Sequence, residues 1–291
     1  MCGSDEAVLL GLRLNSRQGF RPRSAEGIAV SIKRCRPGGL IYSAPQPVPA
    51  ELADHYGIPP DDYWRTIEPW SPAHYEKQVA DARRLLPYRT GMTALDVGVG
   101  QGKAIRSLIH AGFDAWGMEP SEPFRRFAIE ENGIDPNRVQ LAPLAEAEYA
   151  AGQFDFITFG AVLEHLADPS AALERALDWL KPDGILHAEV PSSNWLGARL
   201  INGWFRLCGT TYVTNLSPTH APFHLFEFTP ASFEANGRRL GYSIAEYRFS
   251  ACGSQHIPDL IRPLVLAIMV QTQTAMQLTV YLRKEGPQSA A

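Results

Sequence analysis

Short apolar runs alternate with amphipathic stretches along most of the chain from about residue 71 onward. Apolar runs with the length and composition of strands occupy residues 93–97, 115–118, 139–141, 154–159 and 185–190. Helical periodicity lies between them, over residues 103–111, 122–131 and 169–180. Alternation of this kind predicts a parallel sheet with helices on both faces, because right-handed crossovers place successive helices there. We therefore expect a doubly wound α/β fold.

Proline after a capping residue marks the predicted helix starts at Ser71, Asp168 and Thr229. Near the end of the chain, residues 242–249 and 276–282 alternate as strands do, with an apolar helix over 264–270 between them. These two strands bring the expected sheet to seven mostly parallel strands, with an antiparallel member at its end.

Two segments lack this alternation of predicted strands and helices. Residues 1–70 carry few periodic apolar runs and many prolines, so we expect a small irregular module ahead of a main domain over 71–291. Residues 192–228 are rich in aromatic residues and turn formers. Because long loops beyond the strand ends of such sheets tend to be functional, we expect this insert after the fifth strand to act as a lid. A local helical hairpin with its own small core is the alternative.

A glycine loop follows the first strand of the main domain and leads into a helix. It contains Asp96, Gly98, Gly100 and Gly102. Glycine permits positive φ in a tight turn and close approach of a ligand to the backbone, and the helix beyond offers free N–H groups. Glu119 ends the next predicted strand, about 20 residues after Gly98, where a carboxylate reaches ribose hydroxyls. This order predicts a nucleoside-containing ligand rather than an empty turn.

The glycine spacing departs from the dinucleotide fingerprint G-x-G-x-x-G, because the third glycine comes one residue early. This spacing, together with the lack of a recognisable catalytic Tyr-Lys or His-Asp pair, disfavours a nicotinamide-dependent oxidoreductase, which stays as an alternative beside a catalytically inactive cofactor-binding protein. A third alternative is an enzyme that uses a sulfonium cofactor for another reaction.

Several segments resemble those of class I S-adenosylmethionine-dependent methyltransferases, the small-molecule type. The resemblance rests on DVGVGQG at 96–102, FDFI at 154–157, VLEHLADP at 162–169, LKPDG at 180–184 and HLFEFTP at 224–230. It covers about residues 72–285 and implies a Rossmann-like methyltransferase fold and enzyme with S-adenosylmethionine as cofactor. Asp183 departs from the family pattern, which has glycine there.

The resemblance also implies which residues bind the cofactor. These are Asp96, Gly98, Gly100, Gly102, Met118, Glu119, Pro120, Leu144, Ala145 and Phe159. Glu146 stands near the place where many family members carry an aspartate for the adenine amino group, which puts that contact in doubt.

A methyl acceptor with an oxygen or nitrogen nucleophile usually needs a base beside it. His165 follows the fourth strand, at the edge of the sheet where ligands bind in open α/β folds. Glu164 beside it and His224 in the insert are the further catalytic candidates. Each also has an ordinary alternative, as a loop-ordering or solvent-facing residue.

The N-terminal module holds a second resemblance, to family members with a small zinc-binding domain. Residues 33–42, KRCRPGGLIY, and Cys2 with its neighbours match that motif only in part. Cys2 and Cys35 stand at ligand positions, whereas Gly38 replaces another ligand. Because a structural zinc site needs four ligands, we expect a degenerate knuckle without metal.

Composition narrows the possible partners of the 291-residue chain, whose formal net charge is −4 and pI about 6.1. We expect a small-molecule acceptor with an O, N or C nucleophile, such as a sugar or a lipid-linked compound, and no nucleic acid. Residues 264–270 are too short to span a membrane, and scattered cysteines fit a cytoplasmic protein. The oligomeric state stays open.

Overall fold

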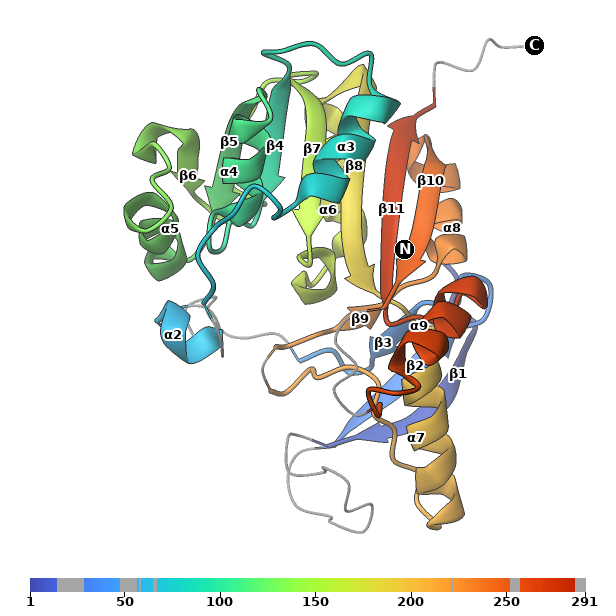
Figure 1. Cartoon of the computed structure of the whole chain (residues 1–291). Coiled ribbons are helices and arrows are strands. Elements are labelled where there is room, and N and C mark those ends of the chain that lie inside the picture. The colour runs from blue at the N-terminus through green and yellow to red at the C-terminus, as the bar shows by residue number, and fades with distance from the viewer. Residues whose placement is uncertain are drawn as a thin grey trace, which may run out of the picture. The chain divides into compact units, whose positions relative to one another are not determined.

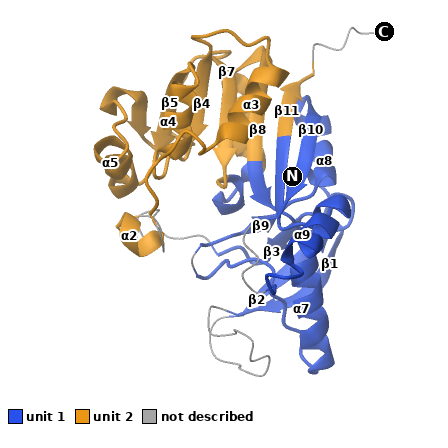
Figure 2. Ribbon diagram, in the orientation of Figure 1, with its two compact units in different colours: residues 1–48, 163–169, 189–280 blue, residues 49–162, 170–188, 281–291 orange. Residues whose placement is uncertain are grey.

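The computed structural model describes residues 1–14, 29–47, 57, 59–64, 67–220, 222–251 and 257–285. The chain divides into two compact units, shown in Figure 2. Unit 1 comprises residues 1–48, 163–169 and 189–280, and unit 2 comprises residues 49–162, 170–188 and 281–291.

A seven-stranded sheet has the strand order β10-β11-β8-β7-β4-β5-β6 (Figure 1). Its strands are β4 (Thr93–Val97), β5 (Asp114–Glu119), β6 (Val139–Leu141), β7 (Phe154–Gly160), β8 (Leu180–Pro191), β10 (Tyr242–Ser250) and β11 (Gln277–Lys284). β4 pairs in parallel with both β5 and β7, and β5 pairs in parallel with β6. The order and the parallel pairings confirm the predicted doubly wound α/β class.

Of the eight helices described, those over residues 103–110, 122–130, 169–179, 230–240 and 262–271 fall close to the predicted positions. The eight helices are α2 (Pro60–Tyr63), α3 (Glu76–Leu85), α4 (Lys103–His110), α5 (Glu122–Glu130), α6 (Pro169–Trp179), α7 (Leu196–Leu207), α8 (Pro230–Leu240) and α9 (Arg262–Gln271), with short 3-10 turns η2 (Pro136–Arg138) and η3 (Leu163–His165). The predicted cap of α8 is confirmed, because the Thr229 side chain accepts a hydrogen bond from the backbone N–H of Ser232.

Ser71 was predicted as the N-cap of α3, which is wrong by four residues, because the N-cap is Tyr75. The backbone N–H of Ser71 donates to Nδ1 of His74 over 2.8 Å, which closes a local turn instead of a helix. Tyr75 then adopts a left-handed conformation with φ 62°, so the helix begins only at Glu76. A side-chain hydrogen bond thus overrides a favourable cap sequence.

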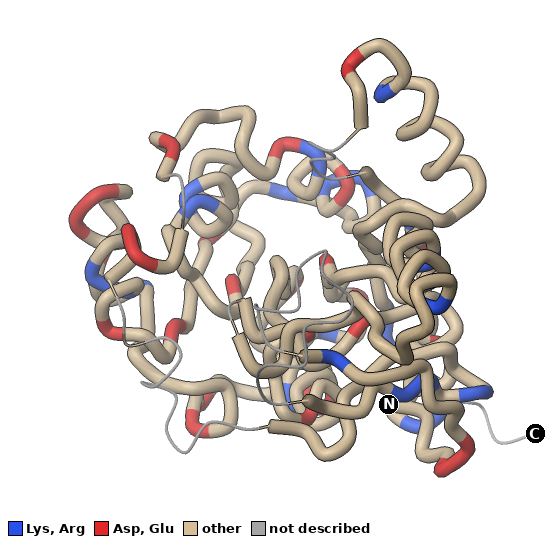
Figure 3. Tube along the Cα trace, turned by 90° about the horizontal axis from the view of Figure 1, so that it is seen from below, with Lys and Arg blue, Asp and Glu red and all other residues tan. Residues whose placement is uncertain are grey.

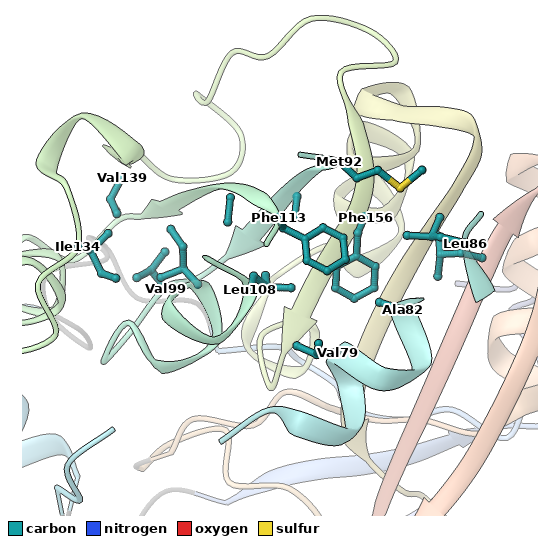
Figure 4. Packing of buried hydrophobic residues seen from close by; sticks show 14 of the residues in the cluster. Val79, Ala82, Leu86, Met92, Val99, Leu108, Phe113, Ile134, Val139 and Phe156 are labelled. Atoms are coloured by element: carbon teal, nitrogen blue, oxygen red, sulfur yellow. The ribbon is translucent and has the colours of Figure 1, made fainter. Parts of the chain in front are cut away.

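The core of unit 2 lies between the parallel strands and α3 and α4. Figure 4 shows Phe113 and Phe156 side by side within it, and their ring centroids are 6.1 Å apart. Val79 and Ala82 of α3 pack in the same cluster. Burying one such aromatic side chain contributes about 1.5–3 kcal/mol, so this cluster fixes the sheet from which the glycine loop extends.

The N-terminal segment is more regular than we expected. β1 (Ala7–Arg13), β2 (Val30–Cys35) and β3 (Ile41–Ser43) form an antiparallel sheet in unit 1, completed by β9 (Phe226–Glu227). The prediction of an irregular module is therefore wrong. Strand β3 is too short to give a periodic signal, and its partner β9 lies far away in the sequence.

The insert over residues 192–228 contributes α7 and β9 to unit 1. β3 pairs with β9 through Tyr42 and Phe226. Val213 and Leu216 of the insert pack with Ile32 of β2 and Ile41 of β3 in a small core. The insert and the N-terminal strands therefore fold together, while its role as a lid stays a prediction.

Charged positions of both signs are spread along the trace (Figure 3). Among the residues that the structure describes, no helix is both long and apolar enough to cross a bilayer.

Candidate active site

The glycine loop between β4 and α4 is built on left-handed backbone. Gly98, Gly100 and Gly102 have φ of 75°, 53° and 81°. A Cβ atom at Gly98 would lie 2.7 Å from Cγ2 of Val162, and one at Gly102 would lie 2.9 Å from Cβ of Ala128. Both conformation and space therefore require glycine here, which leaves a backbone cradle suited to close approach of a ligand.

Asp96 lies beneath this loop and is 2% exposed. Its Oδ2 accepts a hydrogen bond from the backbone N–H of Ile105 over 3.1 Å, which ties the end of β4 to the first turn of α4. Burial and, to a smaller extent, the nearby Glu119 carboxylate outweigh the hydrogen bond from Ile105 and raise the pKa of Asp96 to about 7. The side chain thus orders the loop, and its contact with a cofactor stays a prediction.

Glu119 ends β5 and holds the glycine loop from the other side. Its Oε2 accepts from the backbone N–H of Gly100 over 2.8 Å, and its Oε1 accepts from the backbone N–H of Ser121 over 2.9 Å. Burial raises its pKa, whereas these two bonds lower it. Each carboxylate oxygen retains a second lone pair, which ribose hydroxyls could use.

The remaining predicted cofactor residues differ in exposure. Met118 is buried, and its carbonyl accepts from the N–H groups of Gly98 and Val99. Pro120 and Ala145 are exposed, whereas Leu144 is half-buried. Phe159 on β7 is fully buried, so its side chain has no surface to offer a ligand. Direct contacts of these residues with a cofactor remain predictions.

Trp64 is a residue near the loop that sequence reasoning missed. A Cβ atom at Gly100 would lie 3.5 Å from Cζ2 of Trp64, so the indole lies over the loop. The indole packs on Phe124 at a centroid distance of 4.5 Å and on Tyr63 at 5.2 Å. The only feature of the sequence that could have indicated this contact is the pair of adjacent aromatic residues at 63 and 64, and nothing in the sequence linked that pair to Gly100.

The structure brings the three predicted catalytic residues together in unit 1. The rings of His165 and His224 lie 4.9 Å apart, and Nε2 of His224 lies 4.0 Å from Oε1 of Glu164. The backbone N–H of Leu225 donates to the carbonyl oxygen of Glu164 over 2.8 Å, which fastens the segment before β9 to η3. Residues nearly 60 positions apart in sequence thus form one cluster.

Burial governs the protonation of this cluster. It raises the pKa of Glu164 to about 8, with a further contribution from the Glu189 carboxylate. It lowers the pKa of His165 to about 4 and that of His224 to about 3. Both imidazoles are therefore neutral at pH 7, and each has one ring nitrogen that carries a lone pair and can act as an acceptor. Oε2 of Glu164 is buried without a hydrogen-bond partner among the described residues, which is an unusual state for a polar atom.

The same three side chains could also hold a metal ion. One ligand atom from each residue lies within 4.8 Å of the others. Carboxylate and imidazole ligands suit zinc and several other divalent ions, although three ligands leave an open position. The expectation of a metal-free site therefore stays a prediction.

Two residues of this cluster stand close in the sequence to a residue that contacts the glycine loop. Val162, whose side chain faces Gly98, is followed immediately by Leu163, the first residue of η3. Glu164 and His165 therefore come two and three residues after a contact of the glycine loop.

Comparison with known proteins agrees with this arrangement. The methyltransferase domain family matches residues 73–246. A ubiquinone biosynthesis O-methyltransferase of Methylococcus capsulatus is 35% identical over 97 residues, which are 32% of this chain and 41% of that protein. The Marinobacter nauticus enzyme of the same name is 31% identical over 162 residues, which are 54% of this chain and 66% of that protein. Each match thus spans less than two thirds of the relative.

A solved structure shares the fold at low sequence identity. The 1,6-didemethyltoxoflavin-N1-methyltransferase of Burkholderia thailandensis, with bound 1,6-didemethyltoxoflavin and S-adenosylhomocysteine, has a TM-score of 0.50 and 16% identity. The similarity covers 91% of this chain and 98% of that one. The matched domain, the glycine cradle and the sheet order agree, and the chain belongs to the methyltransferase domain family, whose Rossmann-like fold it has.

Proposed function

We propose that this protein transfers a methyl group from S-adenosylmethionine to a hydroxyl oxygen of a small molecule. The observation that carries the proposal is the cluster of Glu164, His165 and His224, because Glu164 and His165 follow Val162, the residue that faces Gly98, by two and three positions in the sequence. Binding alone would not require a buried acid and two neutral imidazoles.

The residues that would hold the cofactor are those of the cradle. Gly98 and Gly100 give the loop its left-handed turns, Asp96 fixes the loop, and Glu119 offers its free lone pairs to ribose hydroxyls. The bound cofactor supplies an electrophilic methyl group. The protein then needs mainly to align the acceptor and exclude water.

The acceptor side needs a group that removes the hydroxyl proton. Neutral His165 can accept this proton at its ring nitrogen, and the partner His224 and the acid Glu164 can orient the acceptor by hydrogen bonds. An oxygen acceptor is favoured because the matched relatives are named O-methyltransferases of ubiquinone biosynthesis. That name also keeps lipid-linked acceptors among the candidates, alongside sugars.

A substrate screen tests the proposal. Purified full-length protein is incubated with S-adenosylmethionine and panels of hydroxylated aromatic compounds, lipid-linked phenols and sugars, and S-adenosylhomocysteine release is measured. We expect release that depends on an acceptor with a free hydroxyl and is absent for the matched methyl ether. Turnover only with amine or carbon acceptors would reject the oxygen assignment, and cofactor binding without turnover on any class would favour a non-catalytic protein.

A further inference from the structure

Two thiols of unit 1 lie in direct contact. Sγ of Cys2 is 3.0 Å from Sγ of Cys35, and neither cysteine is in a disulfide. Cys35 is the last residue of β2 and pairs across the sheet with Ala7, the first residue of β1. The segment before β1 therefore bends back so that Cys2 meets the end of the neighbouring strand.

The backbone around Cys35 is fixed by its own turn. The N–H of Cys35 donates to the carbonyl oxygen of Leu40 over 2.8 Å, and the N–H of Gly39 donates to the carbonyl oxygen of Cys35 over 3.0 Å. The segment before β1 is held as well, since the carbonyl oxygen of Met1 accepts from Nη1 of Arg239 over 2.8 Å and from Nδ2 of Asn236 over 3.1 Å. Both thiols are thus held against each other by ordered backbone.

The surroundings do not complete a metal site. At the position of the missing ligand, a Cβ atom on Gly38 would lie 3.7 Å from Cβ of Cys2, so the knuckle keeps its shape without that ligand. Among the residues described, no histidine, acid or further cysteine forms a metal-binding group with this pair. A structural zinc ion needs four ligands, and two thiolates supply only half of them. The pair is therefore better suited to thiol–disulfide exchange than to metal binding.

We propose that Cys2 and Cys35 form a reversible thiol–disulfide site that reacts with low-molecular-weight disulfides such as glutathione disulfide. The Cys2 thiolate attacks one sulfur of glutathione disulfide, forming a mixed disulfide and releasing one glutathione thiolate. The Cys35 thiolate then attacks the Cys2 sulfur, closing the Cys2–Cys35 bond and releasing the second glutathione. Two protein thiols are oxidised, one glutathione disulfide is reduced to two thiols, and the two protons leave with them.

The order of attack follows from access and acidity. Cys2 is half-buried, whereas Cys35 is 4% exposed. Burial raises the pKa of Cys2, but hydrogen bonds from the Cys35 thiol and the Ser4 backbone outweigh it and leave the pKa lowered. Burial and the hydrogen bond to Cys2 raise the pKa of Cys35. Cys2 therefore supplies the attacking thiolate, and Cys35 resolves the mixed disulfide.

A Cys2–Cys35 disulfide would restrain the turn between β2 and β3, which contacts the segment just after His224. Oγ1 of Thr229 at the cap of α8 donates to the carbonyl oxygen of Gly38 over 2.5 Å, and β3 pairs with β9 immediately after the turn. A covalent link across residues 2–35 also removes conformational freedom from the unfolded chain. Oxidation should therefore stabilise the fold measurably.

The test uses the full chain with Cys208 and Cys252 replaced by serine, so that only the pair remains. The protein is equilibrated in glutathione buffers of graded redox ratio, alkylated, digested and mapped by mass spectrometry, and its Tm is measured in parallel. We expect a peptide cross-linked through Cys2 and Cys35, formed in step with a Tm increase on the order of 5 °C and reversed by excess thiol.

Single variants Cys2→Ser and Cys35→Ser in the same background serve as matched controls. We expect a stable mixed disulfide with glutathione on Cys2 in the Cys35→Ser variant and much slower modification in the Cys2→Ser variant, without the Tm increase in either. The proposal is overturned if both thiols of the parent remain open to alkylation in excess glutathione disulfide. Stoichiometric zinc bound by both thiols of the parent would overturn it equally.

Discussion

The imidazole rings of His165 and His224 lie 4.9 Å apart with their planes at 65°, although one follows β7 and the other precedes β9. A shared environment links their titration, because each charged ring would disfavour a charge on the other. Together with buried Glu164, they give the protein a site in which neutral nitrogen bases and an acid meet.

Replacement of His165 by alanine should lower the rate of methyl transfer by ~10²–10⁴, because the acceptor loses its proton acceptor. Cofactor affinity should stay nearly intact, since the residues predicted to bind the cofactor are elsewhere. Single-turnover kinetics with an acceptor from the screen, together with calorimetry, measure the two effects separately. Glu164→Gln is the matched comparison and should change the affinity for the acceptor more than the chemical step.

Full activity in His165→Ala would place the base elsewhere, and His224→Ala would become the next variant to measure. If neither variant loses activity, the acceptor arrives already nucleophilic and the protein works by alignment alone.

Gly98→Ala should abolish detectable cofactor binding. The added methyl group would lie 2.7 Å from Cγ2 of Val162. Alanine would also have to adopt the left-handed φ of 75° that glycine has here, which is unfavourable for a residue with a Cβ atom. Gly152→Ala is the matched control, because that glycine also has positive φ, at 63°, but an added Cβ atom would meet nothing within 4 Å. Calorimetry and circular dichroism on both variants distinguish loss of the cradle from loss of folding, and equal affinities in the two would contradict the account.

Glu119→Ala should weaken cofactor binding about 10- to 100-fold, because hydrogen bonds to a charged acceptor contribute about 1.5–3 kcal/mol each. The variant also removes the acceptors for the N–H groups of Gly100 and Ser121. Glu122→Gln on the exposed side of α5 controls for the loss of charge nearby. Unchanged affinity of Glu119→Ala in calorimetric titration would show that the carboxylate only shapes the loop.

Stability should fall at acidic pH through Asp155. Its Oδ2 accepts from Nζ of Lys181 over 2.7 Å and from the backbone N–H of Thr93 over 2.8 Å. Burial raises its pKa, but the bonds from Lys181 and Thr93 outweigh it and leave the pKa lowered. A lowered folded-state pKa means that this stabilisation is present above the unfolded value, about 3.9, and is lost as pH falls through the folded value.

Asp155→Asn should therefore reduce the free energy of unfolding at pH 7 by about 1–2 kcal/mol and flatten its acid dependence. Urea titrations between pH 7 and pH 3 measure both effects. Asp183→Asn, on the exposed side of β8, should leave the curve unchanged. Parallel pH dependence in wild type and Asp155→Asn would rule out this carboxylate as a source of acid sensitivity.

The glycine cradle could be predicted from sequence because its causes are local. Gly100 and Glu119 are set by one strand–loop–helix–strand unit, and the hydrogen bond between them needs no distant partner. The meeting of Glu164 with His224 was not predictable in detail, because it depends on how the insert returns to η3 through the Leu225 hydrogen bond. Trp64 was missed for a similar reason, since its contact with Gly100 depends on the path of the chain before α3.

The N-terminal sheet shows most clearly which part of the fold could not be predicted from the sequence. Strand β3 spans three residues, and its neighbour β9 spans two, so neither gives a periodic signal of its own. Their pairing depends on Ile32 and Ile41 meeting Val213 and Leu216 in a small core. Long-range packing of this kind decides secondary structure where the local pattern is too short to do so.

The central claim is that the cradle formed by Gly98–Gly102 and Glu119 binds S-adenosylmethionine. Isothermal titration of the purified full-length protein with S-adenosylmethionine tests it most directly. We predict one site per chain with micromolar Kd, on the order of −8 kcal/mol, and no binding in the folded Gly98→Ala variant. A folded wild-type protein that gives no binding signal, after any retained ligand has been removed, would contradict the account.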